Sequence, residues 1–165
     1  MICLVPKYEA NRMTSWGVGP KFAIISLVLG FLLIFANYYF FPRLILPSNE
    51  FVFWFGIGLV AFGLSIMFLA AFQVHQAFNR GRLIKSGIYA HIRNPVYASW
   101  ILFIVPGLFL ATRVLFLIIM PFIMYALIRR LILGEERYLE QKFGKEYSDY
   151  KNTVNSIVPK ISWKR

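Results

Sequence analysis

Long runs without charged side chains dominate this chain and alternate with short polar stretches. Residues 22–41 and 51–72 contain no Asp, Glu, Lys or Arg, and apolar residues also dominate 98–111 and 114–133. A helix of about 20 apolar residues crosses the roughly 30 Å hydrocarbon core of a bilayer. The pattern therefore predicts an all-α integral membrane protein with about four transmembrane helices. The third run is short and contains Pro106-Gly107, which predicts a bend.

The tail after the fourth run is polar, and it carries five of the seven acidic residues, all at or after Glu135. Residues 135–143 have the pattern of a short cytosolic amphipathic helix that begins at the acidic doublet and is stopped by Gly144. Glycines within the second run have two interpretations. They either let another helix approach closely, which we favour, or place backbone against a cofactor.

Composition supports the membrane class. Hydrophobic residues make up 59% of the chain and mean hydropathy is +0.63, values that exclude a disordered protein. A net charge of +11 is typical of nucleic-acid binders, but in membrane proteins it more often reports basic cytoplasmic loops. All 18 lysines and arginines except Arg43 and Arg113 lie in the N-terminal, central and C-terminal polar regions. We therefore predict a multi-pass protein with both termini cytosolic and no nucleic-acid partner.

The central polar stretch, residues 81–97, is longer and more detailed than a simple connection requires. Two crossings separate it from Glu135-Glu136, so both can meet on one face of the bilayer. Each residue taken alone has a plain explanation: Arg93 as a membrane anchor, Asn94-Pro95 as a helix start, and the acidic doublet as helix-start charge. His75 and His91 have no second ligand at suitable spacing, so no metal site is predicted.

The order of residues across both stretches resembles the isoprenylcysteine carboxyl methyltransferase family, to which phospholipid methyltransferases are related. The resemblance covers residues 83–159, nearly half of the chain. It lies in three segments: Gly87-x-Tyr89-x-x-x-Arg93-Asn94-Pro95-x-Tyr97, then Glu135-Glu136-x-x-Leu139-x-x-x-Phe143-Gly144-x-x-Tyr147-x-x-Tyr150, and finally Val158-Pro159. The family usually has a histidine where Asn94 stands here. Asparagine can replace it in holding a cofactor but not in transferring a proton.

The resemblance implies a membrane enzyme that transfers a methyl group from S-adenosylmethionine to a small or lipophilic acceptor. Length and composition predict one membrane domain over residues 1–165, with N-terminal helices in 1–72, and the resemblance places the cofactor-binding and catalytic part in 73–165. Arg93, with Arg129 or Arg130 as further candidates, would hold an anionic acceptor. The cofactor-binding candidates are Lys85, Gly87, Tyr89, Asn94, Pro95, Tyr97, Glu135 and Glu136. Neither the acceptor nor the oligomeric state follows from the residues.

Two alternatives remain open at this stage. Membrane sterol-reductase-like proteins share an Arg-x-Pro-x-Tyr arrangement but bind NADPH, and the acidic doublet disfavours a phosphate-rich cofactor. A non-catalytic membrane protein would instead use its basic face for anionic lipid or a protein partner.

Overall fold

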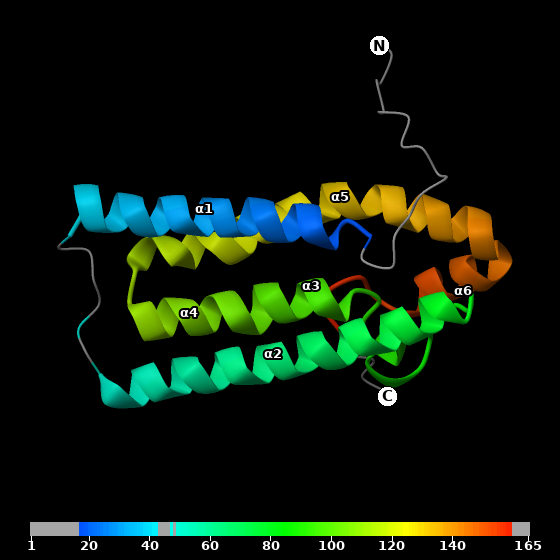
Figure 1. The fold of residues 1–165 in the computed structure, drawn as a ribbon, viewed down its shortest axis with the longest axis horizontal. Coiled ribbons are helices and arrows are strands. Elements are labelled where there is room, and N and C mark those ends of the chain that lie inside the picture. The colour runs from blue at the N-terminus through cyan, green and yellow to red at the C-terminus, as the bar shows by residue number, and fades with distance from the viewer. Residues whose placement is uncertain (1–16, 43–46, 48, 160–165) are drawn as a thin grey trace, which may run out of the picture.

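The computed structural model describes residues 17–42, 47 and 49–159 and folds them into a helical bundle (Figure 1). In chain order the helices are α1 (Gly19–Phe40), α2 (Glu50–Asn79), η1 (Gly87–Ala90), α3 (Pro95–Ser99), η2 (Trp100–Ile104), α4 (Val105–Thr112), η3 (Leu115–Ile119), α5 (Met120–Phe143) and α6 (Lys145–Thr153). Four segments are long and apolar enough to cross a membrane: Gly19–Phe40, Glu50–Ala77, Pro95–Thr112 and Leu115–Phe143. The predicted all-α class with four crossings is confirmed. The predictions about the N-terminal side and Arg43 lie outside the described residues.

The third crossing is a composite of α3, η2 and α4. Its middle piece, Trp100–Ile104, is a π-helical turn in which the Val105 N–H bonds the Trp100 carbonyl. Pro106 follows in the first turn of α4 and has no N–H to offer the preceding turn, so the ordinary ladder is interrupted there. The irregularity therefore begins one turn before the predicted Pro106-Gly107 bend.

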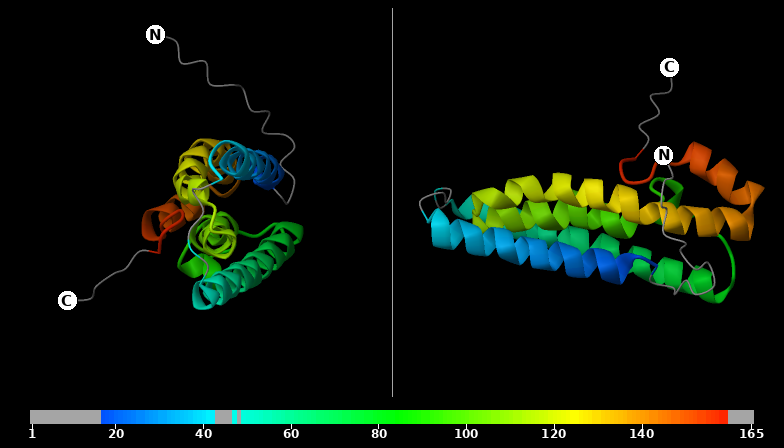
Figure 2. Two further views of the ribbon diagram at one scale, coloured as in Figure 1. Left: turned by 90° about the vertical axis from the view of Figure 1, so that its left-hand side faces the viewer. Right: turned by 90° about the horizontal axis from the view of Figure 1, so that it is seen from above.

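This composite crossing lies between the other helices (Figure 2), with α2 packed along it on one side and α5 on another. Glycines on both elements allow the close approach. A Cβ at Gly56 would lie 2.7 Å from the carbonyl oxygen of Gly107, and one at Gly63 would lie 2.8 Å from the Ile104 side chain. These two glycines serve helix packing. By contrast, Gly58 faces open space.

The acidic doublet lies inside α5, so the prediction that a separate helix over residues 135–143 begins at this doublet is wrong. Residues at four-residue spacing bury one continuous stripe of α5, which runs through Gly134 without a break: Met120, Met124, Ile128, Ile132 and Glu136. That periodic burial stabilises the helix beyond the cost of one interior glycine, about 1 kcal/mol. Gly144 ends α5 as predicted, with a φ of 55°. The short amphipathic helix is α6, which buries Tyr147 and Tyr150.

Polar segments gather at one end of the bundle. The start of α1, the last turns of α2 and α5, and the whole of η1 and α6 lie there, as Figure 1 shows on its right-hand side. At the opposite end α4 turns sharply into η3 through Arg113, whose φ is 60°. The lateral faces are apolar and open: on α1, for example, Phe31, Phe35 and Tyr39 are exposed and stack in a row.

Candidate active site

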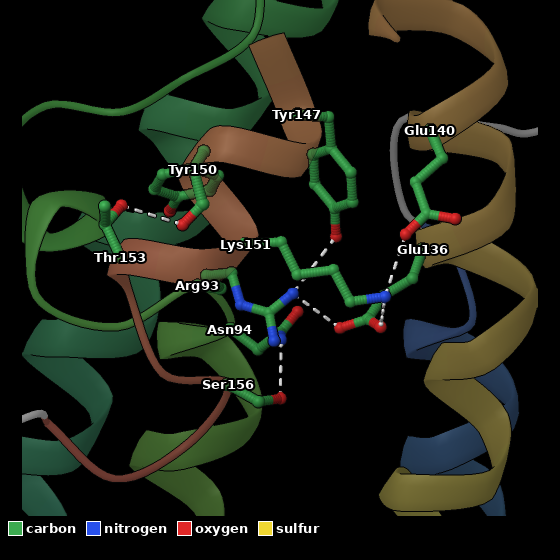
Figure 3. Close-up of polar contacts among 9 residues, drawn as sticks. All are labelled: Arg93, Asn94, Glu136, Glu140, Tyr147, Tyr150, Lys151, Thr153 and Ser156. Atoms are coloured by element: carbon green, nitrogen blue, oxygen red, sulfur yellow. Dashed lines mark hydrogen bonds and ion pairs between the residues drawn. The ribbon is translucent and has the colours of Figure 1, made fainter. Parts of the chain in front are cut away.

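The two polar stretches meet through a buried ion pair. Arg93, in the loop before α3, places Nη1 2.7 Å from Oε1 of Glu136 on α5, and the side chains are only 11% and 10% exposed (Figure 3). The same Nη1 donates to the Tyr147 hydroxyl at 3.4 Å. The expected meeting of the central stretch and the tail on one face is therefore confirmed.

Helix α6 contributes a second cation to Glu136. The Lys151 ammonium lies 2.8 Å from Glu136 Oε2 and 2.8 Å from Glu140 Oε1, as Figure 3 shows. The hydrogen bonds to Glu136 and then to Glu140 raise the pKa of Lys151, so it stays charged. Glu136 is thus enclosed by two positive charges, and its role in this arrangement is to hold α6 and the Arg93 loop against α5.

Residues 154–159, which we call the C-terminal strap, fix the Arg93-Asn94 loop from the other side. The N–H of Arg93 donates to the Asn155 carbonyl at 2.9 Å, and that of Asn94 to the Ser156 carbonyl at 3.0 Å. The Asn94 side chain also donates, from Nδ2 to Ser156 Oγ at 3.0 Å. Ser156 uses one of the two Nδ2 hydrogens, so the acceptor Oδ1 and the second Nδ2 hydrogen remain available to a ligand.

Buried tyrosines connect η1, which precedes this loop, to α2 and α6. Tyr150 donates its hydroxyl to the Tyr89 carbonyl at 2.6 Å, and Tyr89 donates to the Ala70 carbonyl at 3.2 Å. Burial raises the pKa of Tyr89 above its usual value and raises those of Tyr147 and Tyr150 to about 12. All three hydroxyls therefore stay protonated at neutral pH and are not bases: those of Tyr89 and Tyr150 donate, and that of Tyr147 accepts from Arg93.

A cavity of about 210 Å³ opens where these elements converge. One water molecule needs only roughly 10–15 Å³ of such space, so the cavity can accept a ligand. It lies between the start of α1, the end of α2, the Arg93-Asn94 loop and the last turns of α5. Its polar wall is formed by Tyr89, Arg93, Asn94, Tyr97, Glu135, Tyr147 and Tyr150, and its other lining residues include Val74, Ala77, Arg82, Leu83, Tyr138, Leu139, Lys142 and Phe143.

Glu135 is the acidic side chain of this cavity. Its Oε1 accepts the N–H of Val18 at 2.5 Å and the Tyr97 hydroxyl at 3.4 Å. Gly17 lies against the same carboxylate with a φ of 50°, and a Cβ there would overlap Glu135 Oε1. Only glycine fits both the backbone conformation and the space. The start of α1 is thereby held at the edge of the cavity.

The model of the isoprenylcysteine carboxyl methyltransferase family matches residues 57–141, which is more than half of the chain. This chain belongs to that family. The match confirms the resemblance seen in the motifs and places the chain among membrane methyltransferases. It favours neither the reductase nor the non-catalytic alternative.

Individual relatives agree with the assignment. A protein-S-isoprenylcysteine O-methyltransferase of Dictyostelium discoideum is 28% identical over 95% of this chain and 70% of its own length. The Saccharomyces cerevisiae protein of the same name is 33% identical over 48% of this chain and 33% of its own length. A solved structure of a eukaryotic intramembrane Ras methyltransferase of this family shares the fold, with a TM-score of 0.62 at 21% identity. The match covers 86% of this chain and 53% of that structure, so the chain spans about half of its length.

The structure places the predicted site residues in three groups. Tyr89, Arg93, Asn94, Tyr97 and Glu135 line the cavity together. Glu136 and Pro95 are buried behind it, Glu136 with Arg93 and Lys151, and Pro95 at the start of α3.

The remaining predicted residues are not among those that line the cavity. Lys85 forms an exposed ion pair with Glu146 at 2.7 Å. Gly87, with a φ of 63°, lies close to the Gln73 side chain. Arg129 and Arg130 are exposed on α5. The roles assigned to these residues stay predictions.

Several residues that build the site were not predicted. Ser156 and Lys151 hold the loop and Glu136 from the C-terminal side, Gly17 reaches Glu135 from the start of α1, and Arg82 and Lys142 line the cavity. Tyr147 belonged to the recognised motif, which could have identified it as a site residue. Ser156 lies beside the motif pair Val158-Pro159, but nothing local in the sequence specifies its partner.

Proposed function

We propose that this chain transfers a methyl group from S-adenosylmethionine to the carboxylate of an isoprenylcysteine-type lipophilic acceptor. The supporting observation is a cavity in which both family motifs converge, with the acid Glu135 and the cation Arg93 in its wall. S-adenosylmethionine supplies a methyl group on a cationic sulfur; the acceptor oxygen forms the new C–O bond while the C–S bond breaks and leaves its electron pair on sulfur.

The residues of the cavity fit the donor. Glu135 has a carboxylate oxygen, Oε2, available for the ammonium of its amino-acid end, and Asn94 Oδ1 can accept from a ribose hydroxyl. Arg93 Nε is buried and has no hydrogen-bond partner among the described residues. A buried donor without a partner requires an explanation, and an anionic group in the cavity supplies one. Tyr138 and Phe143 offer aromatic surface for the adenine.

The charges of the cavity residues fit a carboxylate acceptor. A carboxylate is already a nucleophile, so the chain does not need a general base, and the protonated Tyr147 and Tyr150 provide none. Arg93 donates to the reacting carboxylate through the N–H groups that Glu136 does not occupy. Arg129 and Arg130 are exposed on the same helix as Glu135 and remain second candidates for the acceptor. Positioning of the two reactants supplies the rate.

Asn94 has a holding role in this proposal. It presents an amide fixed by Ser156, and no proton has to move through it. His91, three residues earlier, is exposed and follows the last residue of η1, and it does not line the cavity. Replacing the histidine usual in the family by Asn94 is therefore compatible with methyl transfer.

The basic polar end of the bundle supports a cytosolic active site, by the same charge rule that predicts the topology. Cysteines introduced one at a time at Lys85 and Arg113, in a Cys3→Ser background, should react with an impermeant label from opposite sides of sealed vesicles. A cysteine at Lys145 is the matched control and should react like the one at Lys85. Labelling of positions 85 and 113 from one side would contradict the four-crossing topology.

Parallel calorimetric titrations test the proposed chemistry directly. Purified protein in detergent should bind S-adenosylhomocysteine saturably and should not bind NADPH, and Glu135→Gln should weaken the first interaction. Binding of NADPH alone would support the reductase alternative. Binding of neither, by a protein whose unfolding transition is cooperative, would support a non-catalytic function in anionic lipid or partner binding.

A further inference from the structure

The charged side chains that line the cavity differ in whether an oppositely charged residue already pairs with them. Three are cationic, Arg82, Arg93 and Lys142, and one is acidic, Glu135. Arg93 is already neutralised by Glu136 at 2.7 Å in a buried pair. Under the proposed function, Glu135 meets the ammonium of the donor. The cation of the cavity wall that has no partner among the described residues is Arg82.

These two cations lie on different elements at the open side of the cavity. Arg82 follows α2, one residue after Gly81, and its side chain is exposed. Lys142 projects from the last turn of α5 and is also exposed, with its ammonium 5.4 Å from the centre of the Phe143 ring and 5.8 Å from that of Tyr138. We call this pair the cationic mouth.

Nearby acids among the described residues do not pair with Arg82. Glu146 pairs with Lys85, and Glu140 pairs with Lys151. Asp149, on α6, does not line the cavity. Within the described part of the chain, the Arg82 guanidinium has no ion pair or side-chain hydrogen bond. An exposed, unpaired arginine beside an apolar-walled cavity attracts an anionic head group whose tail is apolar.

We propose that Arg82, assisted by Lys142, is the specificity-determining residue that captures the acceptor by its negative charge before transfer. This inference rests on the proposed function and concerns the acceptor alone. It assigns to the enzyme acceptors with an anionic head, and it disfavours acceptor peptides that carry a lysine or arginine next to the prenylated cysteine. Methylation removes the acceptor's charge, so the neutral ester is no longer held at the mouth.

The test compares acceptors of different charge on wild-type protein and two variants, Arg82→Gln and Arg82→Glu. The acceptors are N-acetyl-S-farnesylcysteine and the dipeptides in which acetyl-Glu or acetyl-Lys precedes farnesylcysteine. In phosphatidylcholine nanodiscs, KM of the wild type should rise in the order Glu, no added residue, Lys. Each step should be roughly five-fold at low salt and smaller at 0.5 M salt, as for charges near a surface. Values of kcat should stay within two-fold, since Arg82 does not touch the reacting atoms.

The variants sharpen the expectation. Arg82→Gln should compress the order of KM values, Arg82→Glu should invert it, and Arg82→Lys should keep it in part. Arg80→Gln, an equally exposed change two residues away that does not line the cavity, is the matched control and should behave as wild type. An unchanged order of KM in Arg82→Gln and Arg82→Glu would overturn the proposal, and so would an effect on kcat alone.

Two further outcomes distinguish binding of the acceptor from binding of lipid head groups, and failure of this inference from failure of the proposed function. If the order of KM appears only when phosphatidylglycerol is added to the nanodiscs, Arg82 binds lipid head groups and the acceptor proposal is wrong. If wild-type protein fails to bind S-adenosylhomocysteine, the proposed function itself is wrong. Normal S-adenosylhomocysteine binding and turnover, with KM insensitive to Arg82, would remove only the present inference.

Discussion

Two faces of the last turns of α5 carry the same acidic residue type but have opposite surroundings. Glu135 belongs to the cavity face, together with Tyr138, Leu139 and Lys142. Glu136 belongs to the α6 face, where it meets Arg93 and Lys151. One residue along a helix is a rotation of about 100°, so adjacent side chains point into different environments. The comparison separates a carboxylate available to a ligand from one that holds the scaffold together.

The largest expected effect is a loss of stability when Glu136, on the α6 face, is replaced. Glu136→Gln removes the counter-charge of Arg93 and of Lys151, and breaking a buried ion pair by removing one partner costs about 3–5 kcal/mol. Thermal unfolding in detergent should show this loss. Glu140→Gln is the matched control, because Glu140 is 38% exposed and bonded only to Lys151 on this face, and it should change stability far less. Equal stability of Glu136→Gln and wild type would contradict the assigned division.

Replacing Glu135, on the cavity face, should lower the affinity for S-adenosylhomocysteine and leave stability unchanged. Glu135→Gln keeps an oxygen for the Val18 N–H but loses the charge-assisted bond to the donor's ammonium, worth about 1.5–3 kcal/mol. S-adenosylhomocysteine affinity should fall by roughly ten-fold or more by calorimetry. The unfolding temperature should stay near that of wild type. Glu146→Gln, a surface change on α6, should leave the affinity unchanged, and unaltered binding by Glu135→Gln would refute the ligand role.

A smaller effect is expected at the strap. Ser156→Ala removes the acceptor of the Asn94 Nδ2 hydrogen bond while the backbone bonds of the strap persist, a loss of about 0.5–1.5 kcal/mol. Affinity for S-adenosylhomocysteine should decrease roughly two- to ten-fold, because the Asn94 amide is no longer fixed. In a double-mutant cycle, Ser156→Ala should add nothing to Asn94→Ala. Additive losses would mean that Ser156 acts on the cavity by another route, and Ser148→Ala is the control.

The smallest effect is expected at the exposed pair between Lys85 and Glu146, whose side chains are 45% and 52% exposed. Such pairs contribute from zero to about 1 kcal/mol and are screened by salt. Lys85→Ala should therefore lower stability only slightly at low salt and not at all at 0.5 M. A large loss of S-adenosylhomocysteine affinity in this variant would instead support the sequence-based assignment of Lys85 to the cofactor site.

The sequence was sufficient to predict the crossings and the meeting of the two polar stretches. Charge-free runs near 20 residues report membrane spans directly, and an even number of crossings returns the chain to its starting side. The residues of the recognised motifs then identified most of the polar wall, including Asn94, Tyr97 and Glu135.

The contacts that the sequence did not reveal are distant along the chain. Glu135 meets Val18 across 117 residues, and Asn94 meets Ser156 across 62. Nothing in the local pattern specifies these partners. The change to a polar sequence after the fourth apolar run also suggested that a new helix begins at the acidic doublet. The buried stripe that continues to Glu136 overrides that signal, and it becomes visible only when α5 is packed against its neighbours.

The late position of the C-terminal strap in the chain determines when the site can form during synthesis. Its hydrogen bonds to Arg93 and Asn94 come from Asn155 and Ser156, more than 60 residues later in synthesis. A chain interrupted between the last membrane crossing and α6 can insert all of its spanning helices, yet it lacks the strap contacts of the loop and the Tyr147 contact of Arg93. Biogenesis of the site is therefore separated in time from membrane insertion. An inserted but truncated product is therefore a membrane protein in which the walls of the cavity are incomplete.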